Sequence, residues 1–250
     1  MPAEEAQMTI DRYLDTLQKT CLALSRELRF DKTHPLQFTL VAQYGSILEL
    51  AGAIVVLRQH GCTTGVPAVF RTLLETSVEF SNLSADPKYG YYWEAADLDG
   101  WLRLLKAARR GNNPYLADLE RIANLGFIID SYQARFDALR EDGYRPLTIG
   151  KRFERAGMSA AYESVYNMLS ADAHSNRRAL IGRHLDITSE GFDLTLYKSV
   201  DQLAFADTTA AILLESTRTI HAALGRDAGL DLDPLEAEFG RVRAEYASEA

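Results

Sequence analysis

The chain has 250 residues, of which 47% are hydrophobic, so it is long enough to bury the core of one large helical domain or of two small ones. Its formal net charge of −8 argues against binding nucleic acid through a broad basic face, although a local basic groove stays open. The two cysteines have no spacing typical of a zinc site or a disulfide framework, which fits a reducing cytoplasm.

The N-terminal sequence MPAEEAQMTI is acidic and lacks the apolar stretch of a secretory signal. The longest apolar stretches, such as AGAIVVL, fall short of the roughly 20 residues that a membrane-spanning helix needs. We therefore expect a cytoplasmic protein without a membrane span.

The first part of the chain has three helical patterns. Residues 4–29 place apolar side chains at steps of three and four residues, as an amphipathic helix does. Residues 36–60 are apolar nearly all round at their centre, which predicts burial on several sides. A third helix covers residues 66–84 and has Pro67 in its first turn. We expect the second and third helices to form the buried centre.

The rest of the chain continues the helical pattern between turns that contain glycine or proline. The further predicted helices cover residues 87–110, 114–141, 148–156, 158–173, 199–224 and 233–247. Apolar and polar residues alternate around a Ser-Glu-Gly turn near residues 184–197, which predicts a small β-hairpin. The predicted fold is an all-α bundle of seven to nine helices in a single domain over residues 1–250. Its core covers about residues 35–225, and residues 226–250 form a peripheral helical tail.

A charged pair interrupts the third predicted helix, VPAVFRTLLETSVEF, which is apolar on most sides. Arg71 and Glu75 are four residues apart, so they can touch on one helix face. Burying charges is expensive unless they are paired and fill their hydrogen bonds. This pair therefore needs polar partners from elsewhere in the chain.

The segment YNMLSADAHSN offers such partners. Taken as a helix, it places Tyr166, Ser170 and His174 on one side. We expect this side to meet the face that carries Arg71 and Glu75, in the bundle interior or in a cleft.

The functional interpretation of this pocket is acid/base chemistry on a phosphate-containing or RNA substrate. His174 is the candidate acid or base because the pKa of an imidazole lies near neutrality. Glu75 orients its ring, and Arg71 holds an anion such as a phosphate. The predicted substrate-binding residues are Ser170, Tyr166 and Asn176. On the structural interpretation the same network only fixes the helix register, and the sequence leaves both interpretations open.

The two motifs together resemble a family of uncharacterised bacterial helical proteins, a domain of unknown function. Its pattern is an Arg-x3-Glu helix followed by a Tyr-x3-Ser-x3-His segment, and the likeness spans roughly residues 35–185. The resemblance implies that Arg71, Glu75, Tyr166, Ser170 and His174 form a site. It implies no particular reaction.

The segment RALIGRH is more distantly similar to the HEPN class of helical ribonucleases, which occur in toxin–antitoxin and phage-defence systems. Their motif is an arginine followed, after four to six residues, by a histidine on the same helix. Here Arg178 and His184 have five residues between them. This resemblance implies cleavage of RNA and an antitoxin-like protein partner.

Other sites have less support in the sequence. Glu49, Glu75 and His174 suggest a carboxylate-bridged metal site, but the second Glu-x-x-His of such sites is missing, so no metal is expected. There is no glycine-rich nucleotide motif, so no cofactor is expected. The aromatic segment YGYYWEAADLDGW is typical of a core or a subunit interface. The alternative to an enzyme is a non-enzymatic interaction or regulatory module in which the network of Arg71, Glu75 and His174 is purely structural. We also expect a homodimer built through long amphipathic helices.

Overall fold

The structure is a computed structural model, and it describes residues 3–173, 177–189, 191–196, 203–226 and 229–247. The chain divides into two compact units, residues 1–84 with 153–250 and residues 85–152. The single domain expected from the sequence stays a prediction.

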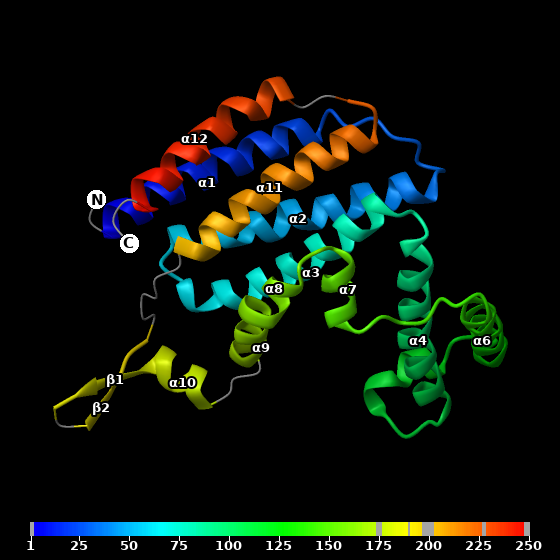
Figure 1. The fold of residues 1–250 in the computed structure, drawn as a ribbon. Coiled ribbons are helices and arrows are strands. Elements are labelled where there is room, and N and C mark those ends of the chain that lie inside the picture. The colour runs from blue at the N-terminus through cyan, green and yellow to red at the C-terminus, as the bar shows by residue number, and fades with distance from the viewer. Residues whose placement is uncertain (1–2, 174–176, 190, 197–202, 227–228, 248–250) are drawn as a thin grey trace. The chain divides into compact units, whose positions relative to one another are not determined.

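The larger unit is built on five long helices that run alongside one another (Figure 1). They are α1 (Ala3–Ser25), α2 (Pro35–Gln59), α3 (Val66–Ala85), α11 (Leu203–Ala223) and α12 (Gly229–Ala247). Helix α1 packs against α2, α11 and α12, and α2 also packs against α11. The buried centre therefore includes α1 and α11, whereas the sequence prediction placed only the second and third helices there.

Small side chains explain the central place of α11. Ala206, Thr209, Ala210 and Thr217 are all fully buried on this helix. The separation of two packed helices depends on the size of the side chains between them, so these residues let α11 lie close to its neighbours. The hydroxyl of Thr217 also lies 2.9 Å from that of Tyr44 on α2, which satisfies both polar groups in the core.

Helix α2 combines length with an apolar sequence. Among the described residues it is the one helix long and apolar enough to cross a membrane by length and composition, which corrects the expectation that no segment reaches that length. The core helix of a soluble protein passes the same test. Helix α2 packs against α1 and α11 and buries the charged side chain of Arg58, as a core helix does. Cytoplasmic localisation stays a prediction.

Helix α12 forms most of the tail that was predicted to be peripheral, residues 226–250. The ring of Phe239 stacks on that of Tyr13 in α1, with 5.2 Å between the ring centroids. The Tyr13 hydroxyl also donates a hydrogen bond to the carbonyl of Leu235 at 3.0 Å. The charged tail thus has an apolar side that packs on α1.

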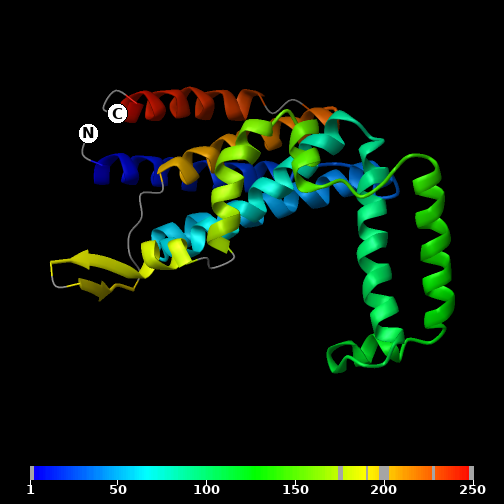
Figure 2. The same ribbon diagram turned by 60° about the horizontal axis from the view of Figure 1, so that its bottom comes forward.

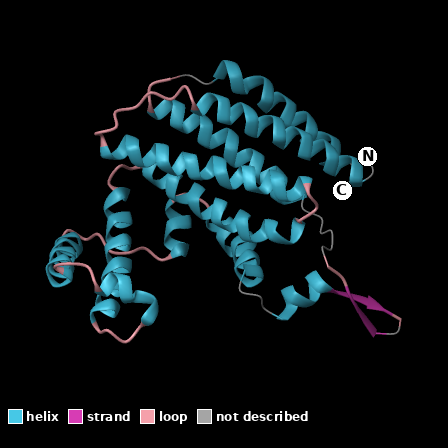
Figure 3. Cartoon of the chain, turned by 180° about the vertical axis from the view of Figure 1, so that it is seen from behind, coloured by secondary structure: helices cyan, strands magenta, loops and turns pink. Residues whose placement is uncertain are grey.

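Short elements connect α3 and α11 to the rest of the chain. They are the 3-10 turn η1 (Thr63–Gly65), α7 (Ile149–Arg155), α8 (Ser159–Ala161), the π-helical turn η3 (Tyr162–Tyr166), α9 (Asn167–Ala173) and α10 (Arg177–His184). The predicted hairpin is present as the antiparallel strands β1 (Leu185–Thr188) and β2 (Gly191–Leu194), with Leu185 opposite Leu194 (Figure 3).

The smaller unit consists mainly of two helices that pack side by side (Figure 2). Its elements are α4 (Tyr89–Arg109), the 3-10 turn η2 (Pro114–Leu116), α5 (Ala117–Glu120) and α6 (Leu125–Glu141). Helix α5 ends at Glu120, and Asn124, in a left-handed conformation with φ 62°, is the N-cap residue immediately before α6. The helix predicted over residues 114–141 is thus broken in two.

The described residues contain eleven α-helices of four or more residues, so the prediction of seven to nine was too low. The break before α6 accounts for one additional helix, and α10, which was not predicted, accounts for the other. The all-α class with one small hairpin is confirmed.

Candidate functional site

Arg71, Glu75 and Tyr166 form a closed hydrogen-bonded group in the larger unit. The Nε atom of Arg71 donates to Oε1 of Glu75 at 3.0 Å. The Nη2 atom of Arg71 donates to the Tyr166 hydroxyl at 3.0 Å, and that hydroxyl donates to Oε1 of Glu75 at 2.9 Å. The predicted meeting of two distant segments is therefore confirmed at Tyr166, which comes from a position 95 residues after Arg71.

Aromatic rings surround this group on one side. The guanidinium carbon of Arg71 lies 5.1 Å from the centroid of the Tyr166 ring, within the range of a cation–π interaction. The Tyr166 ring stacks with that of Tyr162 at 5.5 Å and contacts that of Phe153 at 5.0 Å. Tyr162 and Tyr166 delimit the π-helical turn, a rare geometry that is frequent at functional sites.

Sequence reasoning did not place Phe153 and Tyr162 at this site. Four residues separate Tyr162 from Tyr166, which is the spacing of neighbours on a helix face, so the Tyr162 contact had a signal in the sequence. Phe153 lies on a different helix, α7, and its position depends on tertiary packing.

The electrostatics of the group favour a charged arginine and a protonated tyrosine at neutral pH. Burial acts to lower the pKa of Arg71, but its bonds to Tyr166 and Glu75 raise that pKa above the ordinary value. Burial raises the pKa of Tyr166, and the hydrogen bond from Arg71 opposes this effect. The side chains of Arg71 and Glu75 keep 22% and 37% of their surface exposed, so water and small ligands can reach the pair.

The remaining predicted site residues lie at the C-terminal side of Tyr166. Ser170 is one turn further along, on α9, and is half-buried. His174 and Asn176 lie outside the described residues, so the acid/base role of His174 and the contact of Asn176 stay predictions. Glu49, the candidate third ligand of a metal, is exposed on α2. Among the described residues, no group of three or more His, Cys, Asp or Glu side chains could hold a metal ion.

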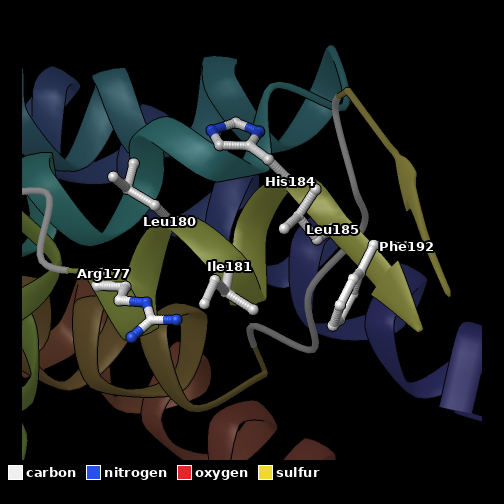
Figure 4. Close-up of a pocket in the computed structure, with 6 residues that line it drawn as sticks. All are labelled: Arg177, Leu180, Ile181, His184, Leu185 and Phe192. Atoms are coloured by element: carbon white, nitrogen blue, oxygen red, sulfur yellow. The ribbon is translucent and has the colours of Figure 1, made fainter.

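A second candidate site is an open depression between α10 and the hairpin (Figure 4). It has a volume of about 780 Å³, and its lining residues are Arg177, Leu180, Ile181, His184, Leu185 and Phe192. The Nδ1 atom of His184 is buried and finds no hydrogen-bond partner within the described part of the chain. The depression is thus mainly apolar, with an imidazole and a guanidinium at its border.

The predicted ribonuclease pair does not share this depression. Arg178 and His184 are six positions apart, which places them about 120° apart around a helix of 3.6 residues per turn. Arg178 is exposed and is not part of the lining. Arg177, two helical turns before His184, lines the depression together with the histidine (Figure 4).

A third, smaller cavity of about 180 Å³ lies between α3 and α11. Hydroxyl groups dominate its polar lining, namely those of Ser77, Ser81, Ser84, Ser216 and Thr219. Sequence reasoning did not find this cavity, because isolated serines in helices carry no pattern.

Of the comparisons with known proteins, one gave a match. No curated protein and no solved structure matches the chain significantly. The model of one family, described as a family of unknown function (DUF5677), matches residues 37–193. The match runs from α2 to β2 and includes Arg71, Glu75, Tyr166 and Ser170. Because it covers more than half of the chain, the protein belongs to this family of unknown function.

Proposed function

We propose that the group of Arg71, Glu75 and Tyr166 binds a phosphate-containing ligand, such as a nucleotide or RNA, and that His174 supplies acid/base chemistry there. The observation that supports it best is that Tyr166, from a distant segment, contacts both members of a charged pair that stays partly exposed. Polar groups gathered at a partly exposed point are typical of binding sites.

The hydrogen-bond donors that the group leaves unused suit an oxyanion. A guanidinium carries five N–H donors, and Glu75 and Tyr166 engage only two of its nitrogens. The third nitrogen can donate to a phosphate oxygen, a contact that arginine makes with favourable geometry. Ser170 contributes a hydroxyl one turn from Tyr166, and His174 follows four residues later in the sequence.

A structural role is the second candidate, and one observation favours it. Each of the three side chains has a partner within the group, so the charges of the arginine and the carboxylate are paired without a ligand. On this alternative the group fixes the register of α3 against the turn that carries Tyr166, and the protein is an interaction or regulatory module.

Charge-changing variants separate the two candidates by the direction of their effects. Binding is measured by fluorescence anisotropy of a short labelled single-stranded RNA and by the thermal shift that ATP or inorganic phosphate causes. If Arg71 binds the anion, Arg71→Gln weakens binding about tenfold, whereas Glu75→Gln strengthens it because a repelling charge is lost. The matched control pair is Lys19→Gln and Asp15→Asn, which alters an exposed ion pair of the same i, i+4 spacing on α1.

Binding can be compared only among folded variants, so each variant is first compared with the wild type by circular dichroism and melting temperature. If both Arg71→Gln and Glu75→Gln bind the probes as the wild type does, or if the wild type binds none, the binding proposal is wrong. A large loss of melting temperature in both, with binding unchanged, favours the structural role.

The catalytic half of the proposal is tested by incubating the protein with total RNA. We expect slow cleavage by the wild type, loss of cleavage in His174→Ala and retained cleavage in His184→Ala. Loss of activity in His184→Ala alone would instead assign the chemistry to α10 and to the HEPN-like interpretation. Intact RNA with all three proteins removes the ribonuclease proposal.

A further inference from the structure

One face of α4 exposes an unusual amount of apolar surface. Trp93, Trp101 and Leu104 are 43%, 42% and 45% exposed. The first two are the only tryptophans of the chain. With 3.6 residues per turn, these three side chains and Asp97 share one face of the helix. The side of α4 opposite Gly100 carries Leu98, Leu102 and Leu105, which are buried within the smaller unit.

Small residues lie beside the large ones on this exposed face. Ala96, Gly100 and Ala107 fall within the same half of the helix circumference as Trp93 and Leu104, and all three are partly exposed. A Cβ atom added at Gly100 would meet no atom within 4 Å. A glycine inside a helix is less favourable than alanine, and packing within the described structure does not require one here.

We propose that this face binds the same face of a second copy of the chain, with the two α4 helices antiparallel about a twofold axis at Gly100. A twofold axis there pairs each residue with the one equally far on the other side of Gly100 in the partner copy. Trp93 then meets the small Ala107, and Leu104 meets the small Ala96. Gly100 meets itself, which lets the two backbones approach closely.

The charges along α4 favour this antiparallel arrangement over a parallel one. Its first half carries Glu94, Asp97 and Asp99, whereas its last half carries Arg103, Lys106 and Arg109. Glu94 and Lys106 already bind Arg135 and Gln133 of α6 within the smaller unit. The charges that flank Gly100 are Asp97 and Arg103, three positions to either side, so an antiparallel second copy places Asp97 of each chain opposite Arg103 of the other. Arg103 is 76% exposed in its ion pair with Asp99, so its side chain is free to reorient.

The proposal concerns α4 and is independent of the proposed ligand site on α3. Sedimentation equilibrium of the full chain between 1 and 100 µM (about the range of ordinary protein–protein affinities) measures the oligomeric state. We expect a concentration-dependent dimer. Because Trp93 lies at the proposed contact, the tryptophan fluorescence emission should move to shorter wavelength as the dimer forms. A monomer throughout this range would overturn the proposal.

Two variants test the geometry of the dimer. Gly100→Leu places a bulky side chain on the twofold axis and should give a monomer without a loss of melting temperature, since leucine favours the helix. Asp97→Arg should raise the dimer dissociation constant at least about tenfold, because it places like charges opposite each other twice. The double variant Asp97→Arg with Arg103→Asp should restore most of the affinity.

Asp130→Arg on α6 makes the same change in net charge at an exposed position away from this face, and it should leave the dimer intact. A dimer that persists in Gly100→Leu, or that Asp130→Arg weakens as much as Asp97→Arg does, would show that another surface or the net charge governs association. Either result overturns the assignment to α4.

Discussion

The hydroxyl of Tyr166 joins two segments that are 95 residues apart, by accepting from Arg71 and donating to Glu75. We predict that Tyr166→Phe lowers the free energy of unfolding by about 1–2 kcal/mol, since the ring stays and two hydrogen bonds are lost. Tyr162→Phe is the matched control, because the structure records no hydrogen bond of that hydroxyl to any described residue. It should change stability by less than about 0.5 kcal/mol. Urea denaturation followed by circular dichroism measures both values, and equal losses would contradict the role of the hydroxyl.

Among single residues, His221 should make the stability of the fold depend on pH. Its side chain is 1% exposed, and Nε2 has no hydrogen-bond partner in the described part of the chain. Burial lowers its pKa, helped by the positive charge of Arg226, while Glu27 and Asp231 oppose the shift. Below about pH 6.5, the ordinary pKa of histidine, the unfolded chain therefore takes up a proton that the folded chain resists.

We predict that the stabilisation from neutral His221 is complete above this pH and is lost as the pH falls below it. Denaturation curves at several pH values between 5 and 8 should show a steeper acid loss for the wild type than for His221→Leu. His60→Gln, at an exposed histidine after α2, should keep the steep loss. If His221→Leu also keeps it, other groups cause the acid sensitivity.

The sequence could predict Arg71 and Glu75 because a charged pair on an apolar helix requires partners. It could also propose Tyr166, since the polar residues of that segment share a helical face. The contact of Phe153 with this site depends on how α7 packs, and a single sequence carries no record of such a contact.

At the scale of helices, a buried ion pair links α1 to α2. The guanidinium of Arg58 is 2% exposed, and its Nε donates to Asp11 of α1 at 2.5 Å. Removing one partner of a buried ion pair typically destabilises by 3–5 kcal/mol. Asp11 is 28% exposed and Arg58 keeps other interactions, so we expect about 2–3 kcal/mol for Asp11→Ala.

Asp15→Ala is the control on the same helix, because this carboxylate makes only exposed contacts, an ion pair with Lys19 and a hydrogen bond from Gln59 of α2 at 3.3 Å. Exposed ion pairs contribute little, so its effect should stay within about 0.5 kcal/mol. Chemical denaturation measures both variants. A loss for Asp11→Ala no larger than that for Asp15→Ala would show that the Arg58 pair does not hold α1 on α2.

The helix boundaries show where the local sequence pattern is sufficient to predict a helix. The long helices α1, α2, α3 and α11 have continuous apolar periodicity and match the predicted ranges closely. The helix predicted over residues 114–141 is interrupted between Glu120 and Leu125, where the left-handed Asn124 precedes α6 in a pattern that is otherwise compatible with helix. Helix α10 has only a weak apolar periodicity, so the sequence pattern does not predict it.

At the scale of the whole molecule, the two compact units differ in the size of their cores. The larger unit buries side chains from five long helices, whereas the smaller unit has two small clusters between α4 and α6. The sequence indicated the all-α class through composition and periodicity. It could not indicate the division into units, because no linker of distinctive composition marks the boundaries near residues 85 and 152.

The last prediction follows from this difference in core size. Local opening requires less free energy where fewer apolar contacts must be broken, so backbone amides of α4 and α6 should exchange hydrogen faster than those of α2 and α11. Hydrogen exchange with mass spectrometry on the full chain measures the exchange rate for each helix.

If the α4 faces pair in solution, opening of α4 must also break the dimer, and hydrogen exchange in α4 should slow as protein concentration rises. Exchange in α2 and α11 should not change with concentration, and Gly100→Leu should abolish the effect in α4. Equal protection in both units would contradict the expected difference in stability, whereas a concentration effect confined to α11 would place the contact between copies on the larger unit.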